Sequence, residues 1–93
     1  MARLTLESFA GREVRRVYVA ANVREAETVE KLLGGRAIDF AVEMEPFYRP
    51  VAGLIPARYM GAVFYVPSGQ ASYCRRLLEQ AGLWRGVVPE EQS

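Results

Sequence analysis

The sequence predicts a single α+β domain in which two helices cover one face of a four-stranded antiparallel sheet. The same series of four elements occurs twice, in residues 14–44 and 59–88. Each copy consists of a strand-like run, a small polar cap, an amphipathic helix that ends at glycine, and a second extended run. The resulting order of strand, helix, strand, strand, helix, strand is that of a split β-α-β sandwich. The length of 93 residues, with 51% hydrophobic and 25% charged residues, is typical of one globular domain.

The first repeat starts with a strand over residues 14–20, which are rich in β-branched and aromatic side chains. Asn22 then caps a helix that begins at Val23, with Glu25 at the capping-box position. This helix buries a stripe of three residues, Ala26, Val29 and Leu33. The pair Gly34–Gly35 supplies the left-handed residue that ends the helix.

A strand over residues 38–44 completes the first repeat, because its residues alternate strictly between apolar and polar. In the second repeat, residues 59–66 form a third strand, and Ser68 caps a helix over residues 69–81. Gly82 ends this helix. The buried stripe of the second helix consists of Ala71, Cys74, Leu77, Leu78 and Ala81.

A fourth strand is predicted over residues 83–88. Right-handed crossovers place it beside the first strand, followed by the third and then the second. Residues 12–88 thus form the core of the domain. Residues 1–11 are predicted to be an N-terminal arm or an extra strand, and residues 89–93 a loose tail.

The composition excludes several kinds of site. The chain has no histidine and one cysteine, Cys74, so a zinc or haem site lacks ligands, and we predict no metal, no cofactor and no catalytic residue. Cys74 lies on the apolar side of a predicted helix and is interpreted as core. The net charge of +1 argues against a nucleic-acid partner, and no apolar run is long enough for a signal peptide or a membrane span. We expect a protein of the reducing cytoplasm.

The two repeats are joined by an irregular hydrophobic connector, residues 46–58. It is longer than an ordinary hairpin loop, and Pro46, Pro50 and Pro56 interrupt regular structure. The connector is too apolar for a solvated linker, so it must bury its side chains against its own domain, another subunit or a partner. A packed flap, a subunit contact and an effector-binding loop are the three interpretations.

The predicted topology gathers arginine and aromatic residues at one end of the sheet. A helix that begins at Val23, with guanidinium groups nearby, could hold a small anion. No glycine-rich phosphate motif supports this, so salt bridges to Glu25, Glu43 or Glu45 are the alternative. The candidate ligand or partner contacts are Arg24, Phe47, Tyr48, Arg49, Arg58, Trp84 and Arg85.

The sheet face away from the helices is predicted to carry charged and aromatic side chains, namely Asp39, Glu43, Glu45, Arg16 and Tyr18, joined by Tyr59, Val63 and Tyr65. Cross-strand charge pairs would make it a solvated face, whereas its aromatic content favours the stacking of subunits. We favour stacking, in a homo-oligomer that is a dimer or a trimer.

Two runs of the chain resemble a known family. VYVAANVREAETVEKLLGGRAIDFAVE and VFYVPSGQASYCRRLLEQAG, which lie between Val17 and Gly82, are similar to the small prokaryotic signal-transducing domains of unknown function that are likened to nitrogen-regulatory PII proteins. The resemblance implies a bacterial protein with a ferredoxin-like fold, no established catalytic activity, and a long loop between its second and third strands that contacts partners. Nothing here matches the PII nucleotide-binding motifs.

Two functions follow as hypotheses. The first is a non-enzymatic regulatory or protein-interaction module of signal-transducing type, with subunits assembled through the sheet face and residues 46–58 as the contact segment. The second is a PII-like sensor that binds a small anionic metabolite or a nucleotide at the loop end. Catalysis would have to depend on Glu43, Glu45 or Tyr48 and ranks behind both.

Overall fold

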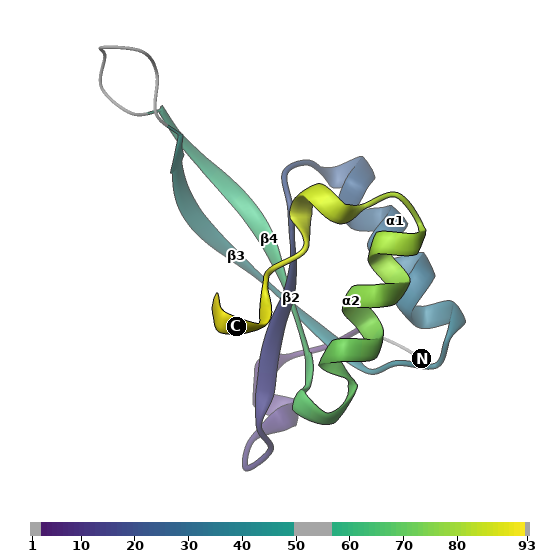
Figure 1. The fold of residues 1–93 in the computed structure, drawn as a ribbon. Coiled ribbons are helices and arrows are strands. Elements are labelled where there is room, and N and C mark those ends of the chain that lie inside the picture. The colour runs from purple at the N-terminus through teal and green to yellow at the C-terminus, as the bar shows by residue number, and fades with distance from the viewer. Residues whose placement is uncertain (1–2, 50–56, 93) are drawn as a thin grey trace.

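The computed structural model describes residues 3–49 and 57–92. They form an α+β structure in which both helices lie on the same side of a sheet (Figure 1). The strands are β1 (Arg3–Leu4), β2 (Val14–Ala20), β3 (Phe40–Arg49) and β4 (Ala57–Pro67). The helices are α1 (Val23–Gly35) and α2 (Ala71–Gln80), and short 3-10 turns are η1 (Leu6–Phe9), η2 (Ser68–Gln70), η3 (Trp84–Gly86) and η4 (Glu90–Gln92).

The sheet has the strand order β1-β3-β4-β2. Its main part is antiparallel, because β4 pairs with β3 on one side and with β2 on the other. The α+β class and the predicted neighbours of these three strands are thus confirmed. The two-residue β1 adds a parallel pairing to β3, with Arg3 opposite Phe40 and Leu4 opposite Ala41, so the N-terminal segment does contribute an extra strand. Phe9 of η1 is buried, and η1 contacts β3.

The predicted fourth strand over residues 83–88 is wrong. Residues 84–86 form η3, and the segment touches β2 only through an isolated bridge between Tyr18 and Val87 and a hydrogen bond from Val88 N to Val17 O of 3.0 Å. Gly86 lies directly on the Tyr18 ring, where an added Cβ would come within 2.3 Å of Cζ. The chain therefore crosses a ring rather than running beside a backbone, and Pro89 has no N–H with which to extend a ladder. The predicted loose tail over residues 89–93 contains η4, and Ser93 lies outside the described residues.

Arg75 of α2 adds side-chain hydrogen bonds at this side of the sheet. Its side chain is 9% exposed, and its guanidinium donates from Nε to Val88 O at 2.8 Å and from Nη2 to Arg16 O at 3.1 Å. One side chain thus joins a helix, β2 and the C-terminal segment at the place where the predicted strand over residues 83–88 would have paired with β2.

The start of α1 is as predicted. Asn22 Oδ1 accepts from Glu25 N at 2.8 Å, and Glu25 Oε1 accepts from Ala21 N at 3.3 Å, so both side chains bond unpaired backbone donors at the helix start. Its end differs, because the left-handed residue is Ala37, with φ 57°, and not a glycine of the pair Gly34–Gly35.

The start of α2 differs from the prediction, whereas its end agrees with it. The helix begins at Ala71 after η2 and has no side-chain cap, so the predicted cap by Ser68 is absent. Gly82 has φ 85°, and Leu83 N donates to Leu78 O at 3.0 Å, which is the Schellman arrangement that the glycine predicts.

A bulge in β2 reverses the expected direction of Tyr18. Arg16 pairs with Tyr65, but Tyr18 pairs with Phe64, so one extra residue separates them. Arg16 consequently lies on the far face of the sheet, whereas Tyr18 turns towards the helices, where it is 1% exposed and packs edge-on against Phe64. The core between sheet and helices includes Val17, Val29, Leu33, Phe40, Val66, Cys74 and Leu78.

The predicted irregular connector over residues 46–58 is wrong at both ends. Phe47 pairs with Tyr59 and Tyr48 with Arg58, so the antiparallel ladder continues where a loop was expected. Pro46 is tolerated because it lies on an edge strand, where β1 has already ended. Residues 50–56, which include the other two prolines of the connector, lie outside the described residues.

Candidate functional site

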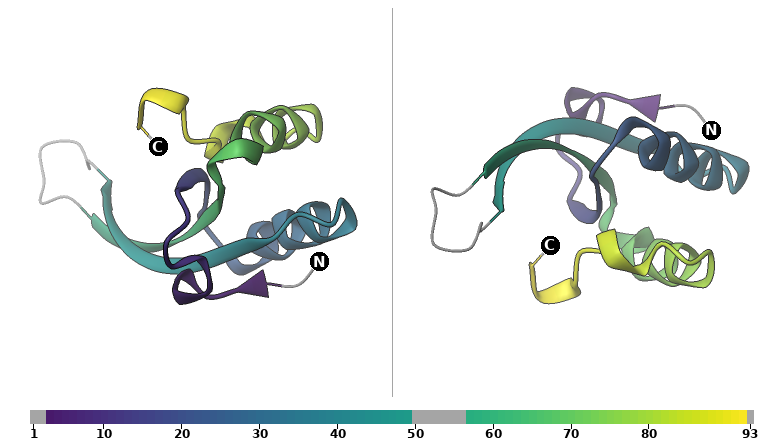
Figure 2. Two further views of the ribbon diagram at one scale, coloured as in Figure 1. Left: turned by 90° about the horizontal axis from the view of Figure 1, so that it is seen from below. Right: turned by 90° about the horizontal axis from the view of Figure 1, so that it is seen from above.

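The ribbon formed by β3 and β4 runs past both helices, as Figures 1 and 2 show. The 10 residues of β3 span about 33 Å, whereas the 13 residues of α1 span about 20 Å. We call the projecting residues 44–49 and 57–61 the arm. Cross-strand partners point to the same face, so the arm has two distinct faces. The face towards the helices carries Met44, Pro46, Tyr48, Arg58 and Met60, and the far face carries Glu45, Phe47, Tyr59 and Gly61.

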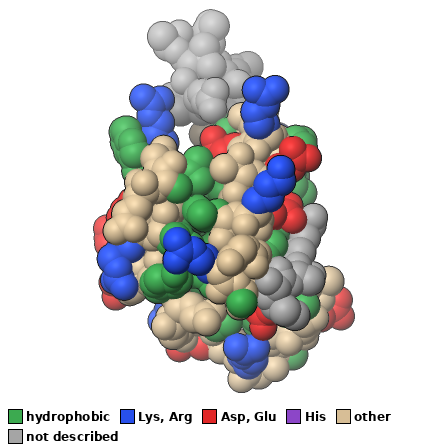
Figure 3. All heavy atoms as spheres, turned by 90° about the vertical axis from the view of Figure 1, so that its right-hand side faces the viewer, with side chains coloured by type: hydrophobic (Ala, Val, Ile, Leu, Met, Phe, Trp, Pro, Cys, Tyr) green, Lys and Arg blue, Asp and Glu red, His purple; other side chains and the backbone are tan. Residues whose placement is uncertain are grey.

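A groove of about 490 Å³ lies between the arm and the first turns of α1. Its apolar lining consists of Ala20, Ala21, Val23, Ala26, Val42, Met44, Met60 and Ala62. Three of these side chains are open to solvent, Val23 at 74%, Met44 at 58% and Met60 at 45% exposure. Glu27 and Glu30 of α1 also line the groove and make that wall acidic. Figure 3 shows hydrophobic side chains at the surface of the helix-covered side, among charged ones.

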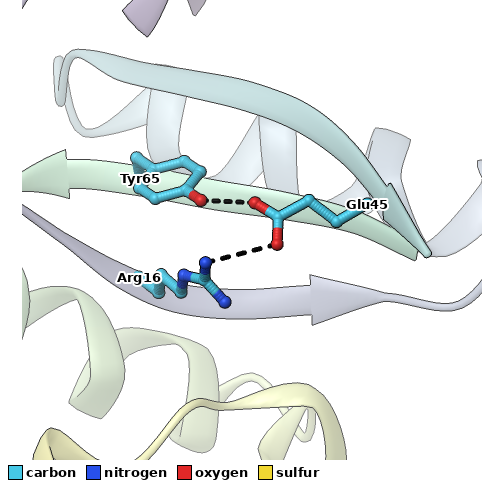
Figure 4. A network of polar contacts seen from close by, with 3 residues as sticks. All are labelled: Arg16, Glu45 and Tyr65. Carbon is cyan, nitrogen blue, oxygen red and sulfur yellow. Dashed lines mark hydrogen bonds and ion pairs between the residues drawn. The ribbon is translucent and has the colours of Figure 1, made fainter. Parts of the chain in front are cut away.

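The far face holds a polar network of Arg16, Glu45 and Tyr65 (Figure 4). The Tyr65 hydroxyl donates to Glu45 Oε2 at 2.5 Å, and Arg16 Nη2 lies 3.3 Å from Glu45 Oε1. Burial raises the pKa of Tyr65, and the Glu45 carboxylate adds to that rise. A cross-strand charge pair on this face is therefore confirmed, and it joins β2 to the arm.

A second cavity, of about 500 Å³, lies on the far face between the arm and the C-terminal segment. We call it the far-face cavity. The rings of Phe47 and Tyr59 line it as a stacked pair, with centroids 5.6 Å apart and planes 28° from parallel. Gly61 makes room for this pair, because an added Cβ there would lie 2.9 Å from Phe47 and from Val19. Arg85 lines the opposite wall and also lies over the Trp84 ring, with Cζ 5.4 Å from its centroid.

The structure brings together only some of the candidate residues named from the sequence. Phe47 and Arg85 meet at the far-face cavity, with Trp84 beside Arg85 and 62% exposed. Tyr48 and Arg58 pair on the other face of the arm. Arg24 is exposed in the first turn of α1 and lines neither cavity. The backbone of Arg49 ends β3, and its side chain lies outside what the structure describes.

Reactive groups are few in the described part of the chain. Cys74 is fully buried, and this burial raises the pKa of its thiol to about 11, so the thiolate is scarce at neutral pH. Burial also raises the pKa of Tyr18, with the Glu25 carboxylate as a further cause. Residues 3–49 and 57–92 contain no group of three acidic, cysteine or histidine side chains placed to hold a metal ion. Within the same ranges, neither helix is long and apolar enough to cross a membrane.

Comparisons of the chain with protein-family models, with curated proteins and with solved structures gave no match. The resemblance to PII-like signal-transducing domains therefore stays a prediction.

The candidate site residues named from the sequence do not include Met60, Tyr59 or Arg75, although Tyr59 was expected on the far face of the sheet. Met60 belongs to the alternating apolar series that continues through Ala62 and Phe64, so its inward-facing position was visible in the sequence. The sequence did not show that the helices end before they reach Met60. Arg75 lies four residues after Ala71 on the buried arc of α2, which is a detectable sign that its charge is held by internal partners.

Proposed function

We propose that this protein is a non-enzymatic interaction module that associates with a second copy of itself through the arm and the groove. One observation carries the proposal. The apolar face of the ribbon continues beyond the helices and leaves Met44 and Met60 exposed beside Val23. Contiguous exposed apolar side chains with charged neighbours are typical of protein interaction sites.

A second copy is the favoured occupant because the surface is complementary to itself. In a two-fold contact the same patch meets on both subunits. Here one wall of the groove is acidic, with Glu27 and Glu30, while Arg58 extends from the arm next to Met60 on the same face. An arm that lies in the groove of the second copy would bring its Arg58 to the acidic wall and its methionines to Val23.

The strand edges of the arm support the same conclusion. In the described residues, β1 pairs with β3 only at Phe40 and Ala41, and β2 pairs with β4 only from Ala62 onwards. Both outer edges of the arm thus lack a strand partner in the part of the chain described here. Open edges are ready to pair with another chain, and natural proteins commonly cover them.

The proposal retains the regulatory, signal-transducing role expected from the sequence, in a cytoplasmic setting compatible with one buried, unpaired cysteine. We also propose that the fold is a variant of the ferredoxin-like fold, in which the segment from Leu83 to Val88 takes the place of the fourth strand. The proposal replaces the expected stacking through the sheet face, because the far face is occupied by the Arg16–Glu45–Tyr65 network and the C-terminal segment. A sensor for a small anionic ligand is the second candidate function. It is favoured because Phe47 and Arg85 line the same cavity.

Sedimentation velocity over a range of concentrations tests the self-association. The wild type should sediment as a dimer at high concentration. Met60→Glu places a charge in the apolar contact and should shift the protein to monomer, whereas Met60→Leu should keep the dimer. Arg58→Glu should weaken the dimer, and adding Glu27→Arg should restore part of it.

Circular dichroism must show the same fold for all these variants. A wild type that stays monomeric at every concentration would contradict the proposal and leave a different protein as the occupant of the groove. A dimer unaffected by Met60→Glu would place the interface elsewhere.

A further inference from the structure

We infer that the far-face cavity binds a planar aromatic ring that carries one carboxylate group. The inference is independent of self-association, since this cavity and the groove lie on opposite faces of the arm. Its walls are formed by the end of β2, the first turn of α1, the arm and the C-terminal segment. Its size, about 500 Å³, is that of cavities which hold small organic molecules.

The aromatic part of the ligand is indicated by the floor. Phe47 and Tyr59 are half-buried and stacked, and Gly61 lets the Phe47 ring lie close against the sheet and Val19. A stacked pair held in this way presents a flat apolar surface of fixed orientation. A third ring gains most by stacking on it or meeting it edge-on, at the centroid distances of about 4.5–7 Å that aromatic pairs prefer.

The anionic part is indicated by the opposite wall. Among the described residues that line the cavity, Arg85 is the only basic one, and it extends from η3, which is fixed in place by the contact of Gly86 with Tyr18. A guanidinium binds a carboxylate through two parallel hydrogen bonds. The aromatic floor and this cation face one cavity, so a ligand with a ring at one end and a carboxylate at the other can contact both.

The charge of the ligand is limited by Glu25, which is the one acidic residue in the lining within residues 3–49 and 57–92. Its Oε1 accepts from Ala21 N, and its carboxylate also faces the Tyr18 hydroxyl, so β2 and the residue that follows it hold the carboxylate in place. A fixed negative charge in the cavity opposes ligands with several negative charges. This favours an aromatic monocarboxylate over a nucleotide, which narrows the anionic ligand expected from the sequence.

Isothermal titration calorimetry with indole-3-acetate as the probe tests the inference. The full-length protein should bind the probe saturably, and should bind indole or acetate alone at least about tenfold more weakly, because each has one of the two required groups. Arg85→Gln and Phe47→Leu should each weaken binding by about tenfold or more. Arg76→Gln, an exposed arginine of α2 outside the cavity, should bind like the wild type.

Two further measurements locate the site. Met60→Glu should retain probe binding, so failure of the dimer and failure of the ligand site can be told apart. The probe should shift the methyl resonances of Val19 and Val87, which line the cavity, and leave those of Val42 in the groove unchanged. Absence of saturable binding to the wild type, equal loss in Arg85→Gln and Arg76→Gln, or resonance shifts confined to the groove would each overturn the inference.

Discussion

The base and the arm of the β3–β4 ribbon share the same two strands but have opposite surroundings. At the base, Phe40 and Phe64 lie under the helices and are 2% and 0% exposed. In the arm, Met44 and Met60 occupy the same face of the same strands and are open to solvent. The period of a strand therefore shows which side chains share a face, and the length of the helices decides whether that face becomes core or surface.

The largest expected effect separates these two regions by stability. Phe64→Ala should lower the free energy of unfolding by about 3–5 kcal/mol, because it leaves a cavity in a packed core. Met60→Ala should lower it by less than about 1 kcal/mol, because nearly half of that side chain is exposed. Urea unfolding of dilute protein, where association is negligible, measures both. Equal losses would mean that the arm is part of the folding core.

Arg75 provides the next test, at the side of the sheet where the predicted strand over residues 83–88 does not form. Arg75→Met should destabilise the fold by about 1–3 kcal/mol, because Arg16 O and Val88 O lose a charged donor. The neighbouring exposed residue gives a matched control, and Arg76→Met should change stability by less than about 0.5 kcal/mol. If both variants unfold alike, Arg75 does not hold the C-terminal segment on β2.

Gly61 tests how tightly the far face of the arm is packed. Gly61→Ala should cost about 1 kcal/mol, at the low end for overpacking, because Phe47 can move outwards from the arm. Gly69→Ala is the control, since nothing lies within 4 Å of its added Cβ. Thermal unfolding compares the two. A Gly61→Ala protein as stable as the control would show that Phe47 does not lie against the sheet.

The smallest effect concerns alkaline pH. The pKa of Tyr65 is raised from 10.0 in the folded protein, so above pH 10 the unfolded chain loses this proton first and stability falls as the pH rises. Tyr65→Phe should make this loss of stability with pH shallower. Below pH 10 the stabilities of the two proteins should differ only by a constant offset. Unfolding curves taken across this range measure it; parallel curves for both proteins would show that Tyr65 titrates normally.

Local chemistry predicted much of the fold. Asn22, Glu25 and Gly82 act at helix ends, and the backbone groups involved are close to them in the chain. Their roles can therefore be predicted from the sequence. Three strands and their neighbours also followed from alternation and the handedness of the crossovers.

The errors came from contacts between distant residues. The apolar run before Pro89 is typical of a strand, but the place of Gly86 depends on the Tyr18 ring, almost seventy residues earlier in the chain. The bulge after Arg16 likewise appears only when β2 is paired with β4. Prolines were interpreted as loop markers in the connector, although an edge strand accommodates Pro46.

The candidate site was predicted in part for the same reason. Phe47 and Arg85 were both named from the sequence, and they do line one cavity. Tyr48 and Arg58 were assigned to the same end, but alternation along the extended strands turns them to the opposite face. A loop would have allowed all four to converge, whereas paired strands separate them.

The central claim is that the packed base of the ribbon stabilises the fold, whereas the arm mediates association with a second copy. The concentration dependence of thermal unfolding tests this most directly, with the wild type and Met60→Glu measured side by side. Over about a hundredfold range of concentration, mass action should raise the apparent stability of the wild type by as much as about 2.7 kcal/mol and leave that of Met60→Glu unchanged. A wild-type midpoint that does not move with concentration would contradict the claim.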